Sequence, residues 1–203
     1  MARLKTSVTA FLAACVAATG SKARPLTAAE RADLAAGDIV VEVKAENGPG
    51  AAAADIFAAI DIAARPEDVW SVMIDCEKAK LFVTNLTSCE ILSVAPDGSS
   101  DVREHVVRYS RLWKPTVNVF RSEYDLNAEI RFERVGGDLR ILEGVWRLQP
   151  LADGEGTRLV YDARLAIGVP LPKIFVRRAA RGDVPRILNA VKTAAEGAAE
   201  QDA

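Results

Sequence analysis

The chain has 203 residues, a length that fits one domain of ordinary size. Half of its residues are apolar and 27% are charged, which is typical of a folded protein with a sizeable core and excludes a disordered chain. The formal net charge of -2 gives no electrostatic reason to expect binding to nucleic acid.

The first 23 residues are typical of an export signal. Arg3 and Lys5 form a positively charged start, and residues 8–18 form an apolar stretch of signal-peptide length. This stretch is too short for a membrane span, which needs about 20 residues. Cleavage after small residues would release a soluble periplasmic protein, whereas the four residues that end at Cys15 resemble a bacterial lipobox. We therefore expect residues 1–23 to be a signal peptide or lipoprotein signal and the protein to be periplasmic or envelope-associated; a cytosolic protein with an uncleaved start is the third alternative.

Two cysteines remain after this segment, Cys76 and Cys89. An oxidising compartment would permit one disulfide between them. Cys76 lies near the start of a short predicted helix and Cys89 in the next predicted strand, so their Cα atoms could lie beyond the ~7 Å limit for bridging. We favour two reduced thiols. With no CxxC pair and a single histidine, we expect no metal site and no cofactor.

The mature chain begins with a short helix. Thr27 is a suitable N-cap, Glu30 stands three residues later as in a capping box, and Gly37 is a stop signal. Residues 24–37 are therefore predicted to form a short N-terminal helix and linker.

A hairpin and two short helices follow. Residues 39–46 and 52–64 mostly alternate between polar and apolar positions, and the Gly- and Pro-containing turn between them predicts antiparallel pairing. Pro66 begins a period near 3.6 that predicts a helix to Asp75. A second short helix is predicted at residues 77–83.

The rest of the chain is predicted to be a meander of strands that ends in one long helix. Short turns rich in glycine, proline and aspartate separate the strands. The strands are predicted at residues 87–95, 101–109, 117–126, 129–135, 139–148 and 157–167. From residue 171 the apolar period becomes helical, and Gly182, Asp183 and Pro185 predict a kink or a helix in two pieces.

Evidence for catalysis is slight. The single histidine, His105, falls on a strand that we expect to be half exposed, so a histidine at the surface or sheet edge is favoured over a general base. Charged residues on the next strands predict cross-strand ion pairs on a solvated face. These residues are Arg121, Glu123, Asp125, Glu129, Arg131 and Glu133.

Three segments carry a resemblance to a known family. They are residues 60–75, with Arg65-Pro66-Glu67-Asp68-Val69-Trp70, residues 144–150 and residues 156–161. Together they resemble the START-like SRPBCC superfamily, and within it the polyketide-cyclase and coenzyme-Q-binding branch. The likeness covers about residues 39–198. It implies an α+β helix-grip domain at residues 38–200, in which a curved antiparallel sheet with two short helices wraps a long C-terminal helix over a cavity.

The resemblance makes a set of mostly apolar residues candidates for the cavity lining. Each of them could equally be ordinary core packing. The candidates are Phe120, Ser122, Tyr124, Phe132, Trp146, Tyr161, Phe175 and Ile187. Trp70 is expected to fasten the first short helix to the sheet. Trp113, beside Lys114-Pro115, is expected in a loop, where it either packs locally, guards the cavity mouth or touches a membrane.

Because members of this superfamily include carriers, cyclases and proteins without known activity, the motifs predict the fold better than the chemistry. We favour an exported protein that binds a lipid, an isoprenoid quinone or a polycyclic aromatic without catalysis. The first alternative is a cyclase- or aromatase-like enzyme that uses the same cavity, with acid–base groups among Arg121, Glu123, Tyr124 and Asp162. The second is a ligand-free domain for protein interaction or stress protection. The expected partners are a hydrophobic molecule or lipid, with peripheral membrane contact and no nucleic acid.

Overall fold

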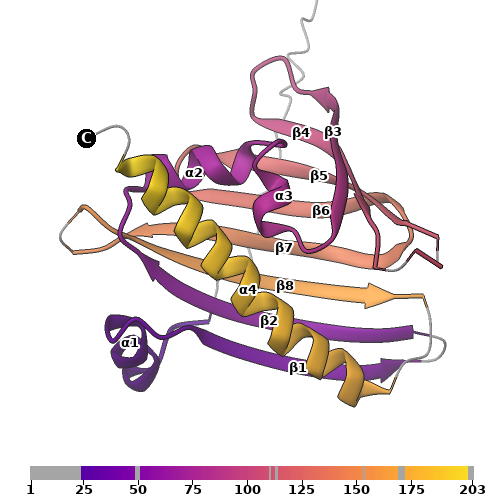
Figure 1. The fold of residues 1–203 in the computed structure, drawn as a ribbon, viewed down its shortest axis with the longest axis horizontal. Helices are drawn as coiled ribbons and strands as arrows, with labels where there is room; N and C mark the ends of the chain where they lie inside the picture. Colours follow the sequence, from indigo (N-terminus) through magenta and orange to yellow (C-terminus); the bar gives the residue numbers. More distant parts are fainter. Residues whose placement is uncertain are drawn as a thin grey trace, which may run out of the picture.

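One antiparallel sheet of eight strands forms the body of the protein (Figure 1). The computed structural model describes residues 24–48, 51–109, 111–112, 114–152, 154–168 and 172–200. The predicted export signal with Cys15, and Trp113, lie outside the described residues. The strand order is β1-β2-β8-β7-β6-β5-β4-β3, so the chain closes a meander from β3 to β8 onto the β1–β2 hairpin.

Four helices accompany the sheet. In chain order the elements are α1 (Ala28–Ala35), β1 (Val40–Gly48), β2 (Ala51–Ile62), α2 (Pro66–Ile74), α3 (Ala79–Phe82), β3 (Leu86–Val94), β4 (Ser100–Val107), β5 (Thr116–Asp125), β6 (Glu129–Gly137), β7 (Leu139–Pro150), β8 (Thr157–Ile167) and α4 (Lys173–Ala199). None of the helices in these ranges is both long and apolar enough to cross a bilayer.

The predicted capping box starts α1. The Glu30 amide donates to Thr27 Oγ1 at 3.2 Å, and the Thr27 amide donates to Glu30 Oε2 at 2.8 Å. Gly37 ends the turn after the helix with φ of +90°, a conformation that favours glycine. Leu34 buries α1 against the convex face of the sheet, beside Val40 and Phe57. The predicted N-terminal helix is confirmed.

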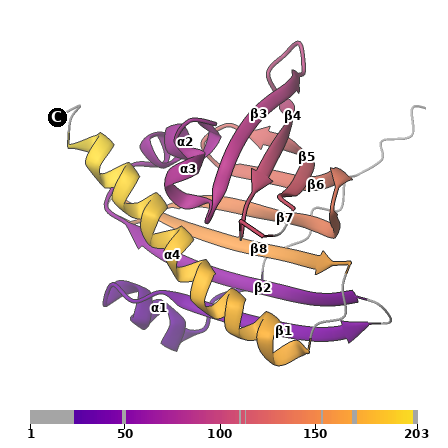
Figure 2. The same cartoon turned by 45° about the vertical axis from the view of Figure 1, so that its right-hand side comes forward.

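The long helix α4 lies against the concave face of the sheet, chiefly along β1 and β2, and also touches α2 and α3 (Figures 1 and 2). Its buried side chains are Val184, Leu188, Val191 and Ala195, at helical spacing. The helix runs without interruption through Pro185, so the alternative of two helical pieces is wrong. Burial of Val184 and Leu188 on either side of Pro185 offsets the backbone hydrogen bond that proline cannot donate.

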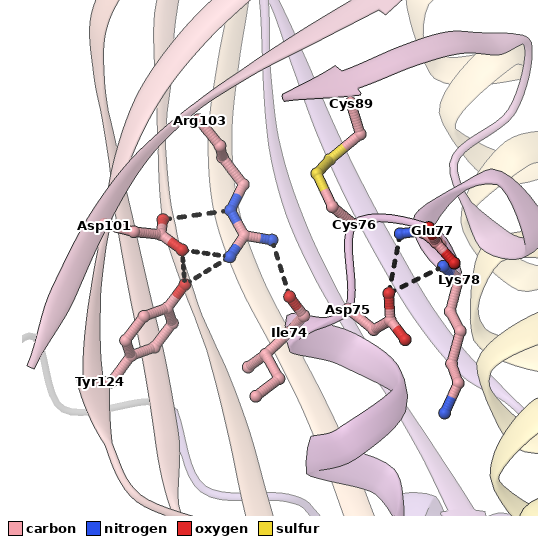
Figure 3. The surroundings of a disulfide bond; sticks show 9 residues. All are labelled: Ile74, Asp75, Cys76, Glu77, Lys78, Cys89, Asp101, Arg103 and Tyr124. Carbon is pink, nitrogen blue, oxygen red and sulfur yellow. Dashed lines mark hydrogen bonds and ion pairs between the residues drawn. A yellow bond between two sulfur atoms is a disulfide. The ribbon is translucent and has the colours of Figure 1, made fainter. Parts of the chain in front are cut away.

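Cys76 and Cys89 form a disulfide, with Cα atoms 5.5 Å apart (Figure 3). The preference for two reduced thiols is therefore wrong. The Asp75 carboxylate accepts hydrogen bonds from the amides of Glu77 (2.8 Å) and Lys78 (3.3 Å), which turns the chain sharply after α2. Because α3 has only four residues, β3 begins soon after this turn and runs back beside it. Cys89 on β3 therefore lies next to Cys76.

The predicted ion pairs lie on the convex face. Arg121 on β5 stands opposite Glu133 on β6, and their charged atoms are 3.6 Å apart. Glu129 pairs with Arg131 and, at 3.0 Å, with Arg147. The exposed pair of Arg121 and Glu133 contributes little to stability, so its main consequence is to keep this part of the convex face polar.

Candidate functional site

Strand register brings four predicted aromatic residues onto the concave face. Phe132 on β6 stands between Ser122 of β5 and Gly144 of β7, and Trp146 on β7 stands directly opposite Tyr161 on β8. Residues that face each other on neighbouring antiparallel strands project from the same side of a sheet. We refer to Phe120, Phe132, Trp146 and Tyr161 as the aromatic floor.

The rings of the aromatic floor touch one another in an unbroken series. The distance between ring centroids is 6.5 Å from Phe120 to Phe132, 6.2 Å from Phe132 to Tyr161, and 4.1 Å from Tyr161 to Trp146. His105 extends the series, because its ring meets that of Phe120 edge-on at 4.9 Å. The floor therefore crosses the four neighbouring strands β5 to β8, and His105 extends the series of rings to β4.

Gly144 makes room for this arrangement. A Cβ atom at this position would lie 2.7 Å from Phe132 Cζ and 2.6 Å from the carbonyl oxygen of Asp162. Those separations are shorter than van der Waals contact, so any larger residue would push the Phe132 ring off the strand.

The floor is less covered than the core beneath α4. Leu188, Leu159 and Ile60 are at most 1% exposed, whereas Phe120, Trp146 and Tyr161 are each half-buried. In Figure 1, α4 runs diagonally from β1 toward α2 and does not cross the right-hand parts of β7 and β8. The concave face thus has a packed half and an aromatic half that remains partly accessible.

A buried polar cluster lies at the end of the concave face near α2 (Figure 3). Asp101 and Arg103 form an ion pair whose side chains are each 6% exposed. The Tyr124 hydroxyl accepts from Arg103 Nη2 and donates to Asp101 Oδ2, each at 2.6 Å. Arg103 Nη1 donates to the carbonyl oxygen of Ile74 at 3.3 Å, which ties the cluster to the C-terminal end of α2.

Burial controls the protonation of this cluster. Burial raises the pKa of Tyr124 to about 12, and the hydrogen bond to Asp101 acts in the same direction, while the charge of Arg103 opposes both. For Arg103, burial alone would lower the pKa, but the partners Asp101 and Tyr124 outweigh it and raise the pKa. At neutral pH the cluster therefore contains a protonated phenol and a charged guanidinium, and both carboxylate oxygens of Asp101 accept hydrogen bonds from these two groups.

The family model for polyketide cyclase / dehydrase and lipid transport matches residues 62–192. The chain belongs to this family. Among curated proteins none matches the sequence significantly. The expected superfamily is confirmed.

Solved structures of this family's wider superfamily share the fold. A START superfamily protein from Mycobacterium smegmatis is 21% identical with a TM-score of 0.60, over 73% of this chain and 99% of that one. The Zhui aromatase/cyclase from Streptomyces sp. R1128 is 20% identical with a TM-score of 0.56, over 73% and 94%. A STAR-related lipid transfer protein from Xanthomonas axonopodis is 15% identical with a TM-score of 0.57, over 76% and 98%. At these identities the comparison shows the fold alone, and the predicted helix-grip is confirmed.

The predicted lining residues outside the aromatic floor differ in their location and exposure. Ser122 and Tyr124 lie on the concave face, with Ser122 fully buried. Ile187 is half-buried on α4, beside its buried stripe. Phe175, in the first turn of α4, is 61% exposed and does not fill the space between helix and sheet. Its place among the lining residues is a wrong prediction, because Phe175 lies off the inward stripe of α4, on which Val176, Ala180 and Val184 pack against the core.

Trp70 packs as predicted. It is buried on α2, and its ring meets Tyr124 edge-on at a centroid distance of 5.7 Å. Trp70 thereby holds the short helix against the same end of the concave face that contains the polar cluster.

His105 does not lie at the surface as predicted. It is half-buried on the concave face, and burial together with the charge of Arg103 lowers its pKa to about 4. The sequence predicted the wrong inward face of β4, because Val102 and Val106 form the more apolar alternation. The inward set is instead Asp101, Arg103, His105 and Val107, whose two charges neutralise each other. The only sequence signal for this inward face was the pair of opposite charges, Asp101 and Arg103, two residues apart on one strand.

The other proposed acid–base residues point away from this face. Arg121 and Glu123 are exposed, and Asp162 faces the convex side opposite Val145. In the described part of the chain no three His, Cys, Asp or Glu side chains gather closely enough to hold a metal ion.

A hollow of about 820 Å³ lies away from the aromatic floor, between α1, the end of β2 and the end of α4. The charged groups Asp61, Arg65 and Lys192 line it. Each has a partner in the chain: Asp61 pairs with Arg158, Arg65 with Asp68, and Lys192 with the Asp61 carbonyl oxygen. Because no unpaired charge among these three points into the hollow, the concave face is the stronger candidate site.

Proposed function

We propose that this protein is exported and binds a hydrophobic molecule on its aromatic floor without catalysis. The observation that carries the proposal is the continuous series of four rings on the concave face, of which Phe120, Trp146 and Tyr161 are half-buried and Phe132 is 8% exposed. The candidates are a lipid, an isoprenoid quinone or a polycyclic aromatic. The family, described as polyketide cyclase / dehydrase and lipid transport, is consistent with such a ligand.

The size of the ligand follows from the energetics of burial. Each buried methylene contributes about 0.8 kcal/mol, and association costs about 4–15 kcal/mol before any net affinity appears. About ten methylenes, or an aromatic body of similar area, are therefore needed for binding. A small polar metabolite buries too little apolar surface.

The state of the polar cluster supports binding over catalysis. A general base needs a pKa near the working pH, whereas the pKa of Tyr124 is raised to about 12 and arginine remains charged. Asp101 is fully engaged by Arg103 and Tyr124. These groups are arranged to hold one another rather than to move a proton.

The disulfide supports export. Disulfides persist in the periplasm and are rare in the cytosol, so Cys76–Cys89 agrees with the signal-like composition of residues 1–23. A hydrophobic cargo in the envelope is exchanged with a membrane, and peripheral membrane contact is part of the proposal. Identification of the mature N-terminus, with palmitate labelling to test Cys15, separates a soluble from a lipidated product.

Native mass spectrometry of the protein after gentle extraction from its source cell tests ligand binding. We expect a co-purifying hydrophobic molecule that is reduced in a Phe120→Ala variant. Val119→Ala is the matched control, because Val119 is the adjacent half-buried residue on the opposite face of β5. A ligand-free wild-type protein that also takes up no added lipid or quinone would refute the proposal.

A cyclase-like enzyme is the second candidate, because the description of the matching family includes polyketide cyclase / dehydrase. Similarity in fold to the Zhui aromatase/cyclase is compatible with it. Turnover of a linear polyketone by the wild-type protein, with loss of that turnover in Tyr124→Phe, would establish the enzyme and displace the carrier.

A further inference from the structure

Two polar side chains meet at the β4 end of the aromatic floor. His105 on β4 stands directly opposite Asn118 on β5. Both lie on the concave side, because the His105 ring contacts Phe120 and Asn118 is two residues before Phe120 on the same strand. Opposed side chains on antiparallel strands have Cβ atoms about 4.5–5.5 Å apart, so one small group can touch both.

Both side chains carry a buried polar atom that lacks a hydrogen-bond partner within the described residues. These atoms are His105 Nε2 and Asn118 Oδ1. Native structures leave few such atoms unsatisfied, because each costs about 1–3 kcal/mol. The neighbouring Asp101, Arg103 and Tyr124 are by contrast fully hydrogen-bonded to one another.

The unsatisfied pair is uncharged. The pKa of His105 is lowered to about 4, mainly by burial and then by the charge of Arg103, with Asp101 opposing. A neutral imidazole can donate or accept at Nε2, whereas an amide oxygen can only accept. A carboxylate or a fully ionised phosphate would meet no positive charge on either of these two side chains, and it has no proton to donate to Asn118 Oδ1.

A hydroxyl group matches the two atoms. It has one O–H to donate to Asn118 Oδ1 and lone pairs to accept from His105 Nε2–H. A ketone or ether oxygen can only accept, and so leaves Asn118 unsatisfied. A hydrocarbon satisfies neither residue.

We propose that His105 and Asn118 form a hydroxyl-recognition pair, and that the ligand is a hydrophobic molecule with an uncharged alcohol or phenol at one end. This inference rests on the proposed binding function and narrows its ligand class. The apolar body lies on the aromatic floor, and the hydroxyl contacts the side chains of His105 and Asn118 on the concave face. Both residues as wholes are half-buried, so they border the accessible part of the concave face.

A matched pair of probes tests the inference. The probes are 2-naphthol and 2-methoxynaphthalene, which share the ring system and differ in the O–H donor. Binding is followed by isothermal titration calorimetry on the purified mature protein. We expect the wild-type protein to bind 2-naphthol about tenfold more tightly than 2-methoxynaphthalene. A factor of this size corresponds to about one well-placed hydrogen bond to a polar group that otherwise has no partner.

Two variants locate the preference. Asn118→Leu and His105→Phe each replace an unsatisfied polar group with an apolar one of similar size, and each should lower the affinity ratio from about ten to near one. Val119→Ala, on the opposite face, should retain the wild-type ratio. Because the two variants alter different strands, one folded variant is enough to locate the preference. Thermal unfolding shows whether each variant is folded.

The outcomes separate this inference from the proposed function. Equal affinity for both probes in the wild-type protein overturns hydroxyl recognition and leaves hydrophobic binding intact. A preference that survives in both Asn118→Leu and His105→Phe also overturns it. If neither probe binds at millimolar concentration and no added lipid or quinone binds either, the proposed function fails and this inference fails with it.

Discussion

The ion pair of Asp101 and Arg103 is the most consequential residue-scale feature of the concave face. Removing two charges from water is unfavourable, and only good geometry repays it. Here both guanidinium edges are used: Arg103 Nε and Nη2 bond to Asp101, Nη2 also bonds to Tyr124, and Nη1 bonds to the Ile74 carbonyl oxygen. The pair therefore fixes the position of α2 relative to β4 and β5.

Loss of one partner from this pair should be severe. Asp101→Ala leaves the Arg103 charge buried without a counter-ion, and we expect the free energy of unfolding to fall by about 3–5 kcal/mol. Asp183→Ala is the control, since its partner Arg186 is exposed and the pair should contribute about 0.5 kcal/mol or less. Urea denaturation measures both. Similar small losses for the two variants would mean that Arg103 finds water in the folded protein.

The only histidine of the chain makes its titration directly readable. We expect the NMR signals of His105 to titrate with a midpoint of about 4 in the folded protein. The unfolded chain takes up this proton near pH 6.5 and the folded chain does not. The contribution of neutral His105 to the free energy of unfolding is therefore complete above pH 6.5, and it is lost as the pH falls from 6.5 toward 4.

His105→Phe isolates this contribution from the carboxylates that titrate in the same range. The free energy of unfolding of the variant should decline less than that of the wild-type protein between pH 6.5 and 4. A wild-type midpoint near 6.5 would place His105 in water and would contradict its position on the concave face.

At the scale of elements, local signals predicted most of the structure. The capping box of Thr27 and Glu30 and the position of Pro66 fix where α1 and α2 begin, and both act within one helical turn. What the sequence did not predict depends on distant pairing. The inward face of β4 is decided by the mutual neutralisation of Asp101 and Arg103, and the Cys76–Cys89 bond depends on how tightly α3 reverses the chain.

The disulfide fastens an edge strand. Among the described residues β3 pairs only with β4, and two irregularities interrupt that register. The bond to Cys76 adds a second attachment, on the turn that follows Ile74 and so beside the Arg103 contact (Figure 3). We infer that the disulfide stabilises the corner formed by α2, α3 and β3.

Removing the disulfide should weaken the fold measurably. The two cysteines are 13 residues apart, and a loop of about 15 residues corresponds to about 3 kcal/mol in the chain-entropy description. We expect the Cys76→Ser/Cys89→Ser double variant, and the wild-type protein in dithiothreitol, to lose stability by about this amount in urea denaturation. The double variant should not respond to dithiothreitol. A wild-type protein equally indifferent to the reductant would contradict the bond.

At the scale of the whole molecule, the concave face is divided between stability and binding. Under α4 most inward side chains of β1, β2 and β8 are buried, and the period of the sequence predicted this core well. The aromatic floor was predicted as a set of inward rings, but its partial exposure depends on the diagonal path of α4 across the sheet. That path is set by packing between elements far apart in the chain, which no local pattern reports.

This division predicts that stability and binding respond to different substitutions. Leu188→Ala removes a fully buried side chain beneath α4, and we expect unfolding to become easier by about 2–5 kcal/mol because a cavity remains. The affinity for 2-naphthol should change little, since Leu188 is not part of the floor. Trp146→Leu removes a half-buried ring that stacks on Tyr161, so it should weaken binding severalfold while destabilising the fold less than Leu188→Ala. Urea denaturation and calorimetric titration of the same preparations compare the two effects. If Leu188→Ala weakened binding as much as Trp146→Leu, the ligand would lie beneath the helix, and the floor would be an extension of the core.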